Sequence, residues 1–186
     1  MVIQIGTTPQ AGFDEPIELL MDCHRRVEHF LDTLVRVAEK APASLPDEYR
    51  RALTTARHYF DQAAPRHTED EEDSLFPRLR ASHDPEAKKV LSRLEALEVD
   101  HRTARADHQR VDLITDRWLE AGAVDEDSRR ELIEVLHRLR RLYTEHIRLE
   151  DEEVFPAAQR LLDDQQLQAI GGEMARRRHI NIESGP

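Results

Sequence analysis

The sequence has little of several things that common protein classes require. It holds a single cysteine, Cys23, which excludes an intramolecular disulfide and a CxxC redox or zinc-ribbon site. Only 6 glycines and 5% aromatic residues argue against an all-β sandwich or barrel. Positive charge is also scarce, because 27 Lys and Arg against 38 Asp and Glu leave a net charge of −11. That balance argues against binding to nucleic acid and against electrostatic docking on anionic membranes.

Long hydrophobic runs are missing as well. No stretch approaches the roughly 18 consecutive apolar residues that span a bilayer. The N-terminal segment MVIQIGTTPQAGFDEP has no basic region followed by an apolar core, so no signal peptide is visible. These absences predict a soluble, reduced, cytoplasmic protein. Histidine, with 10 copies in 186 residues, is the one residue type in excess.

Apolar residues recur at alternating steps of three and four over most of the chain, which is the period of an amphipathic helix. Four rows of such residues, here called seams, predict four long helices, and a last segment from Asp164 to about Ile180 looks helical despite Gly171 and Gly172. Short connections favour an all-α fold, an up-down-up-down four-helix bundle with a short extra C-terminal helix. The expected parts are an N-terminal extension (1–14), the bundle (15–160), and a C-terminal helix and tail (161–186).

Capping residues predict where these helices begin and end. Ser44 is expected to cap the second helix, with Pro46 in its first turn. The second seam runs on into the FPRL sequence at Phe76-Pro77, and the fourth helix is expected to end near Phe155-Pro156. Gly122 is expected to close the third helix, and the residues from Asp125 to Ser128 to cap the fourth.

Each of the four seams contains a histidine at a matching place: His24, His67, His101 and His146. In two seams a glutamate, Glu71 or Glu150, follows four residues later, one helical turn away on the same face. Buried histidine and glutamate are costly unless they are paired or bind a cation. A bundle core that repeats this cost in matching places is most simply explained by metal.

An internal repeat supports the same interpretation. The segment HTEDEEDSLFP at 67–77 aligns with HIRLEDEEVFP at 146–156, and both contain His-x3-Glu followed by Phe-Pro. The residues around His24 likewise resemble those around His101. Two copies of a helical hairpin, each with one His and one His-x3-Glu, predict a pseudo-twofold site with two metals bridged by two carboxylates.

Most single His-x3-Glu pairs on charged helices are solvated ion pairs, and His24-x3-Glu28 and His108-x3-Asp112 are two pairs of that kind in this chain. Cys23 is expected to be a small buried residue rather than a ligand. Five histidines off the seams are expected at the surface: His29, His58, His83, His137 and His179.

The motifs resemble the hemerythrin-like (HHE cation-binding) domains, whose four helices carry a His, a His-x3-Glu, a second His and a second His-x3-Glu. The resemblance covers roughly residues 15–160. It implies a centre of two non-haem iron ions (Fe2+ or Fe3+), with or without a bridging oxo or hydroxo group, and two bridging glutamates. Manganese or zinc would also fit in a heterologous host. The implied metal ligands are His24, His67, Glu71, His101, His146 and Glu150.

One departure from the oxygen-carrying members concerns the third helix, where they have His-x3-His and this chain has Arg105 four residues after His101. One iron should therefore keep an open or water-filled position or take a ligand from elsewhere, which argues against simple reversible oxygen carriage. His108 is expected behind the ligands, along a channel, or as a plain core polar residue. The layer next to the histidines is expected to contain Val27, Ala63, Ala104 and Leu142, with Tyr143 at its edge.

Three classes of function follow from this pattern. The first is a di-iron protein that binds or senses O2, iron or nitric oxide. The second is an enzyme at the same site, a peroxidase or catalase-like oxidoreductase active in oxidative stress or in protecting iron centres, whose substrate would be a small molecule such as H2O2. The third is a purely structural bundle. The sequence identifies no catalytic residue and no oligomeric state, and without an appended output domain a stand-alone protein is expected.

Overall fold

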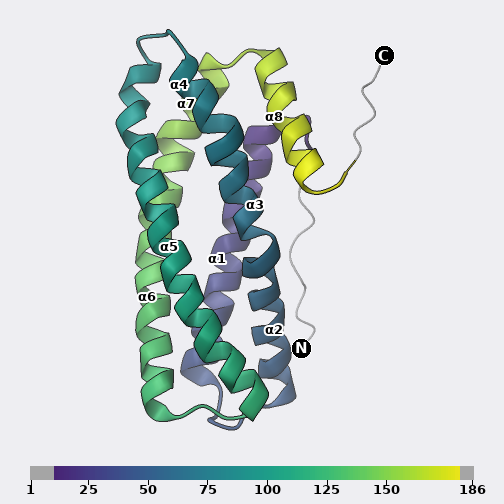
Figure 1. The fold of residues 1–186 in the computed structure, drawn as a ribbon, viewed down its shortest axis with the longest axis vertical. Coiled ribbons are helices and arrows are strands. Elements are labelled where there is room, and N and C mark those ends of the chain that lie inside the picture. The colour runs from purple at the N-terminus through teal and green to yellow at the C-terminus, as the bar shows by residue number, and fades with distance from the viewer. Residues whose placement is uncertain (1–10, 181–186) are drawn as a thin grey trace. The chain divides into compact units, whose positions relative to one another are not determined.

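The computed structural model describes residues 11–180. The elements in this range are all helical, so the fold is all-α, as predicted (Figure 1). The chain divides into two compact units. Unit 1 contains, of the described residues, 11–26, 65–96 and 148–180, and unit 2 contains 27–64 and 97–147. Several helices cross a boundary between the units, so one portion of such a helix belongs to each unit.

Unit 2 is built from four helical segments that share one apolar core. They belong to α1 (Pro16–Lys40), α2 (Asp47–Gln62), α5 (Ala87–Ala121) and α6 (Glu126–Leu149). Their seams meet in one cluster that includes Leu34, Phe60, Trp118 and Leu139, with Trp118 fully buried. The indole of Trp118 donates to the carbonyl of Ala43 at 3.3 Å, so the chain's one tryptophan is fixed in this core.

The turns of unit 2 confirm two of the predicted caps. Gly122 has φ +70°, and its N–H donates to the carbonyl of Trp118, as expected for the glycine that closes a helix. The carboxylate of Asp125 accepts the N–H of Ser128 at 2.8 Å and so caps α6.

The predicted cap at Ser44 is wrong. Pro46 is the residue that precedes the first helical turn of α2, and no side chain caps that turn. Ser44 instead pairs with Ala123 as an isolated bridge, and the N–H of Leu45 donates to the carbonyl of Gly122. This pairing holds the backbone extended up to Pro46, so the helix begins later than the sequence pattern predicts.

Unit 1 holds the short helices and two π-helical segments. These are α3 (Ala64–Glu69), η1 (Asp70–Leu75), α4 (Phe76–Ala81), η2 (Glu150–Val154), α7 (Phe155–Leu161) and α8 (Asp164–Arg177). The predicted end of the fourth helix near Phe155-Pro156 is therefore wrong, because the chain stays helical to Leu161. The chain stays helical through both Phe-Pro sequences. Pro77 and Pro156 are the second residues of α4 and α7, and a π-helical segment directly precedes each of these helices.

A break separates α2 from α3 at Ala63. Pro65 lacks the N–H that would continue the helical ladder, and this explains the break. His58 lies on α2 and is exposed, as predicted, whereas His67 lies on α3 and is buried.

Helix α8 begins with a capping box, in which Asp163 and Gln166 bond each other's backbone N–H groups, and it ends at Arg177 rather than near Ile180. Gly171 is buried within it, and a Cβ atom there would lie 1.8 Å from the carbonyl oxygen of Phe13. Only glycine allows this approach of the N-terminal segment. None of the described helices combines the length and the apolarity needed to cross a membrane.

Candidate metal centre

Unit 1 brings two histidines and two glutamates together in its interior. Each contributes a ring nitrogen or a carboxylate oxygen, and these four atoms all lie within 4.8 Å of one another. All four residues are buried, and both glutamates have an exposed fraction of 0%. They are His24 on α1, His67 on α3, Glu71 on η1 and Glu150 on η2.

Both glutamates stand at or near the start of a π turn. The N–H of Phe76 donates to the carbonyl of Glu71, and the N–H of Phe155 donates to the carbonyl of Glu150, five residues back in each case. The proline that follows each phenylalanine would press on the carbonyl four residues back in a regular α-helix. The wider π turn relieves this contact, and π turns of this kind recur at functional sites.

The side chains of the group face one another at contact distance. Nε2 of His24 lies 3.1 Å from Oε2 of Glu150 and 3.8 Å from Oε1 of Glu71. Nε2 of His67 lies 3.2 Å from the same Oε1 atom of Glu71. The Nε2 atoms and carboxylate oxygens therefore converge on one point from four segments of the chain.

The electrostatics of the group favour a cation. Burial disfavours the charged form of His24, but hydrogen bonds to Asp151 and to the two glutamates outweigh it, and the pKa of His24 is raised well above its usual value. The interior of unit 1 thus attracts positive charge to this point. A divalent metal held by imidazole nitrogens and carboxylate oxygens satisfies the same requirement, so the residues present fit a metal ion.

Two further contacts fix the ring of His24. Its Nδ1 atom lies 2.8 Å from Oδ1 of Asp151, and its ring stacks on Phe155 with centroids 5.2 Å apart and planes 13° from parallel. A carboxylate on the outer nitrogen sets the tautomer of a metal-binding histidine and increases its basicity. Asp151 directly follows Glu150 in the repeat, but nothing in the sequence pattern distinguishes it from the neighbouring acidic residues.

Unit 2 contains the other two seam histidines as a close pair. Nε2 of His101 and Nε2 of His146 are 3.1 Å apart, and Nδ1 of His146 lies 3.5 Å from Oδ2 of Asp100. His146 is buried and His101 is partly buried. Two imidazole nitrogens that face each other, one backed by a carboxylate, form a pair suited to hold a metal ion.

The comparison with known families agrees with this chemistry. Residues 15–158 match the model of the family described as Hemerythrin HHE cation binding domain. The chain belongs to this family. A protein of Haemophilus influenzae, itself described only as an uncharacterized protein, is 29% identical over 175 residues, which cover 91% of this chain and 94% of the relative.

In this HHE domain, other predictions about single residues can be compared with the structure. Cys23 is buried, as expected. Of the five off-seam histidines, four are exposed, whereas His137 is half-buried with Nε2 3.1 Å from Oε1 of Glu39. Arg105, at the position of the missing histidine, is exposed. The assignment of six metal ligands stays a prediction.

His108 and Tyr143 form a hydrogen-bonded pair within unit 2. Nε2 of His108 lies 3.0 Å from the hydroxyl of Tyr143, and burial lowers the pKa of His108 to about 4, so its ring is neutral at pH 7. The ring of Tyr143 meets that of His146 edge-on, with centroids 6.4 Å apart. The sequence predicts both residues near the seam histidines, but it does not reveal this contact.

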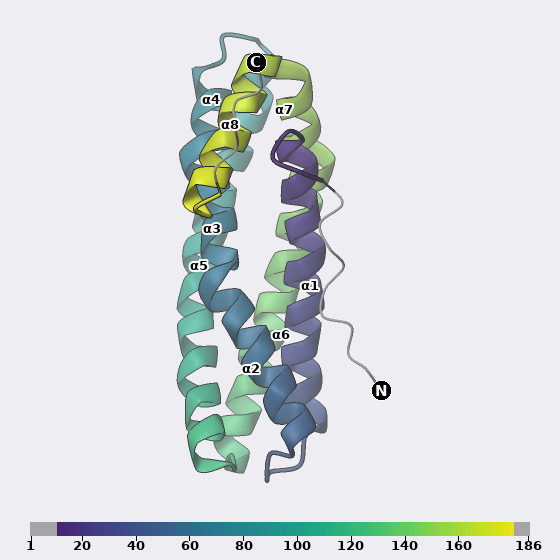
Figure 2. The ribbon, with the colours of Figure 1, turned by 90° about the vertical axis from the view of Figure 1, so that its right-hand side faces the viewer.

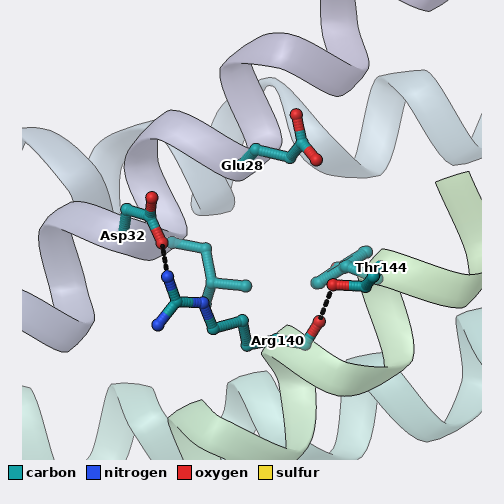
Figure 3. A pocket seen from close by; sticks show the side chains of 6 residues that line it. Glu28, Asp32, Arg140 and Thr144 are labelled. Carbon is teal, nitrogen blue, oxygen red and sulfur yellow. Dashed lines mark hydrogen bonds and ion pairs between the residues drawn. The ribbon is translucent and has the colours of Figure 1, made fainter.

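Tyr143 also lines a pocket of about 320 Å³ between α1 and α6. Figure 3 shows Glu28 and Asp32 on one side and Arg140 and Thr144 on the other. Arg140 is paired with Asp32 at 3.0 Å. Tyr143 therefore lines the pocket and also contacts the ring of His146.

Replacing Asp151 by asparagine is expected to weaken metal binding by about 10- to 100-fold, because the amide keeps the shape of the side chain and loses its negative charge. Competition with a chromogenic chelator measures the affinity. The matched control is Glu152→Gln, which removes an exposed carboxylate from the next position, where it pairs with Arg148. Equal affinities for the two variants would contradict the assigned role of Asp151.

Proposed function

We propose that this HHE domain binds two iron ions at a carboxylate-bridged centre, and that this centre binds or reacts with O2, H2O2 or nitric oxide. The observation that carries the proposal is the buried group in unit 1, with four ligand atoms within 4.8 Å. The proposed ligands are those that the sequence predicts: His24, His67, Glu71, His101, His146 and Glu150.

The donor set supports iron. Imidazole with carboxylate suits iron and other first-row metals, while the absence of a second cysteine from the sequence makes thiolate-rich zinc sites inapplicable. Four histidines and two glutamates also differ from the Glu-x-x-His pattern of ferritin-like sites.

When bound, iron with an open coordination position supplies a site for small oxygen or nitrogen ligands and for electron transfer. The residues of the chain would orient the metal ligands and limit their number. Asp151 and Phe155 hold the ring of His24, and the exposed Arg105 leaves its position without a fifth imidazole. Binding or sensing is the function that these features support best.

A peroxidase or catalase-like activity is the second candidate, and the pair of His108 and Tyr143 favours it. A neutral imidazole hydrogen-bonded to a phenol can hold and pass a proton, which peroxide chemistry requires. Turnover of H2O2 by the iron-loaded protein would support this candidate, and binding without turnover would support the first.

The full chain loaded anaerobically with Fe2+ is expected to contain two irons and to develop a visible absorption band on exposure to air. Loading should also raise the melting temperature, because a ligand at 100 times its Kd stabilises the folded state by about 2.7 kcal/mol. Metal analysis, absorption spectra and thermal melts measure the three quantities. A colourless protein that retains no iron would overturn the cofactor assignment and leave another metal or a scaffold role.

A further inference from the structure

Arginines at the end of helix α8 form hydrogen bonds with the π turn that carries Glu71. They bind Asp70, the residue just before that glutamate. Asp70 is fully buried, with an exposed fraction of 0%. Arg177 donates from Nη1 to its Oδ1 atom at 2.9 Å, and Arg178 donates from Nη2 to its Oδ2 atom at 2.6 Å. Both carboxylate oxygens of Asp70 are therefore held by guanidinium groups. Figure 2 shows α8, in yellow, alongside the segment that runs from α3 to α4.

The other end of the same turn is held by the same helix. Arg177 donates from Nη2 to the hydroxyl of Ser74 at 2.9 Å. Arg78 donates to the carbonyl of Ser74 at 2.7 Å and forms a two-pronged pair with Glu173 of α8, at 2.8 and 3.0 Å. Contacts with α8 thus bracket η1 from Asp70 to Ser74.

This attachment has no counterpart in the second copy of the repeat. The residue before Glu150 is Leu149, so the second π turn lacks the carboxylate that α8 holds in the first. An unpaired buried carboxylate destabilises the fold, and the carboxylate of Asp70 is paired with two arginines. Asp70 lies next to Glu71 in the chain, so fixing Asp70 fixes the backbone from which the Glu71 side chain extends.

We infer that Arg177 and Arg178 are positioning residues for the metal centre, which hold Glu71 in place through Asp70. The inference rests on the proposed function, because it assigns these residues to the orientation of one proposed bridging ligand. A preorganised ligand binds metal more tightly, since the ordering of the turn does not have to accompany binding. The C-terminal helix is then part of the metal site's support, and the two π turns differ in how they are held.

The experiment compares the full-length wild-type protein with the double variant Arg177→Gln/Arg178→Gln. Affinity for Co2+ is measured by chelator competition, and the visible Co2+ spectrum reports ligand geometry, which a loss of stability alone would not change. Affinity is expected to fall by about 10- to 100-fold, the range for loss of outer support, and the spectrum to change. The control is Arg176→Gln, at an exposed position on the same helix turn, which should match wild type.

Two conservative variants keep the test decisive if the double variant does not fold. Arg178→Lys should restore most of the affinity lost in Arg178→Gln, and Asp70→Asn, which keeps the shape of the side chain, should reproduce the loss. Unchanged Co2+ affinity and spectrum in the folded variants, with wild type binding metal normally, would overturn the inference and leave the proposed function standing. Wild-type protein that binds neither Co2+ nor iron would overturn both.

Discussion

Replacing Glu150 by alanine is expected to lower the affinity for iron by about 100-fold or more. Loss of a group that only supports a ligand already costs about 10- to 100-fold, and Glu150 is itself a proposed ligand. Its carboxylate is fully buried and lies 3.1 Å from Nε2 of His24, so its removal takes away an oxygen that faces the ligand group. Metal analysis after gel filtration and chelator competition measure the loss.

The melting temperature of the loaded protein should fall with the affinity, because stabilisation by a bound ligand depends on the ratio of its concentration to Kd. His67→Ala is expected to behave in the same way, since Nε2 of His67 contacts Glu71. The matched control is His58→Ala, which removes an exposed imidazole nine residues earlier. Loss of iron in the His58 variant together with full iron in the His67 variant would show that the seam is placed on the wrong helix face.

Replacing Phe155 by alanine is expected to destabilise the protein by about 3–5 kcal/mol, the usual range for a fully buried phenylalanine. Phe155 has an exposed fraction of 0% and begins α7 directly after the second π turn. Its loss leaves a cavity in unit 1 and also removes the surface on which the ring of His24 stacks. Denaturant unfolding of the metal-free protein measures the stability, and chelator competition measures the metal affinity of the folded fraction.

Phe30→Ala provides the comparison for that variant. Phe30 is buried in unit 2 and stacks on Tyr59, so its removal also creates a cavity but leaves the surroundings of His24 intact. Both variants should lose stability, and only Phe155→Ala should also lose metal affinity. If the two variants lost metal affinity equally, the stacking on His24 would have no separate role.

The sequence predicts the long helices well because their seams are long and strictly periodic. The second seam, from Leu53 through Phe60 and His67 to Leu75, is buried at almost every predicted position despite the break at Ala63. Helix ends are predicted less well. Ser44 is a residue that favours caps, but its backbone pairs with Ala123, a contact between residues far apart in sequence that no local pattern reveals.

In the candidate site, too, the features that follow from periodicity are predicted and those that depend on local geometry are not. Periodicity alone places His24, His67, Glu71 and Glu150 on inward faces, and the structure of unit 1 brings them together. The π turns were not predicted, because the Phe-Pro sequences signal a helix end as readily as a widened turn.

Contacts between distant segments were also beyond the sequence. The pairing of Asp151 with His24 joins residues 127 positions apart, and that of Arg178 with Asp70 joins residues 108 apart. Both repeats contain more acidic residues than make such contacts. The sequence pattern does not show which of these residues pair with a distant side chain.

The position of Trp118 has a practical consequence for following the unfolding of this protein. Because it is the chain's single tryptophan and is fully buried in the core of unit 2, intrinsic fluorescence reports on that core. Colour from a metal bound by His24, His67, Glu71 and Glu150 would depend on the ligands that unit 1 supplies. Two optical signals thus come from different halves of one chain, and their denaturation curves superimpose only when both halves unfold as a single cooperative unit.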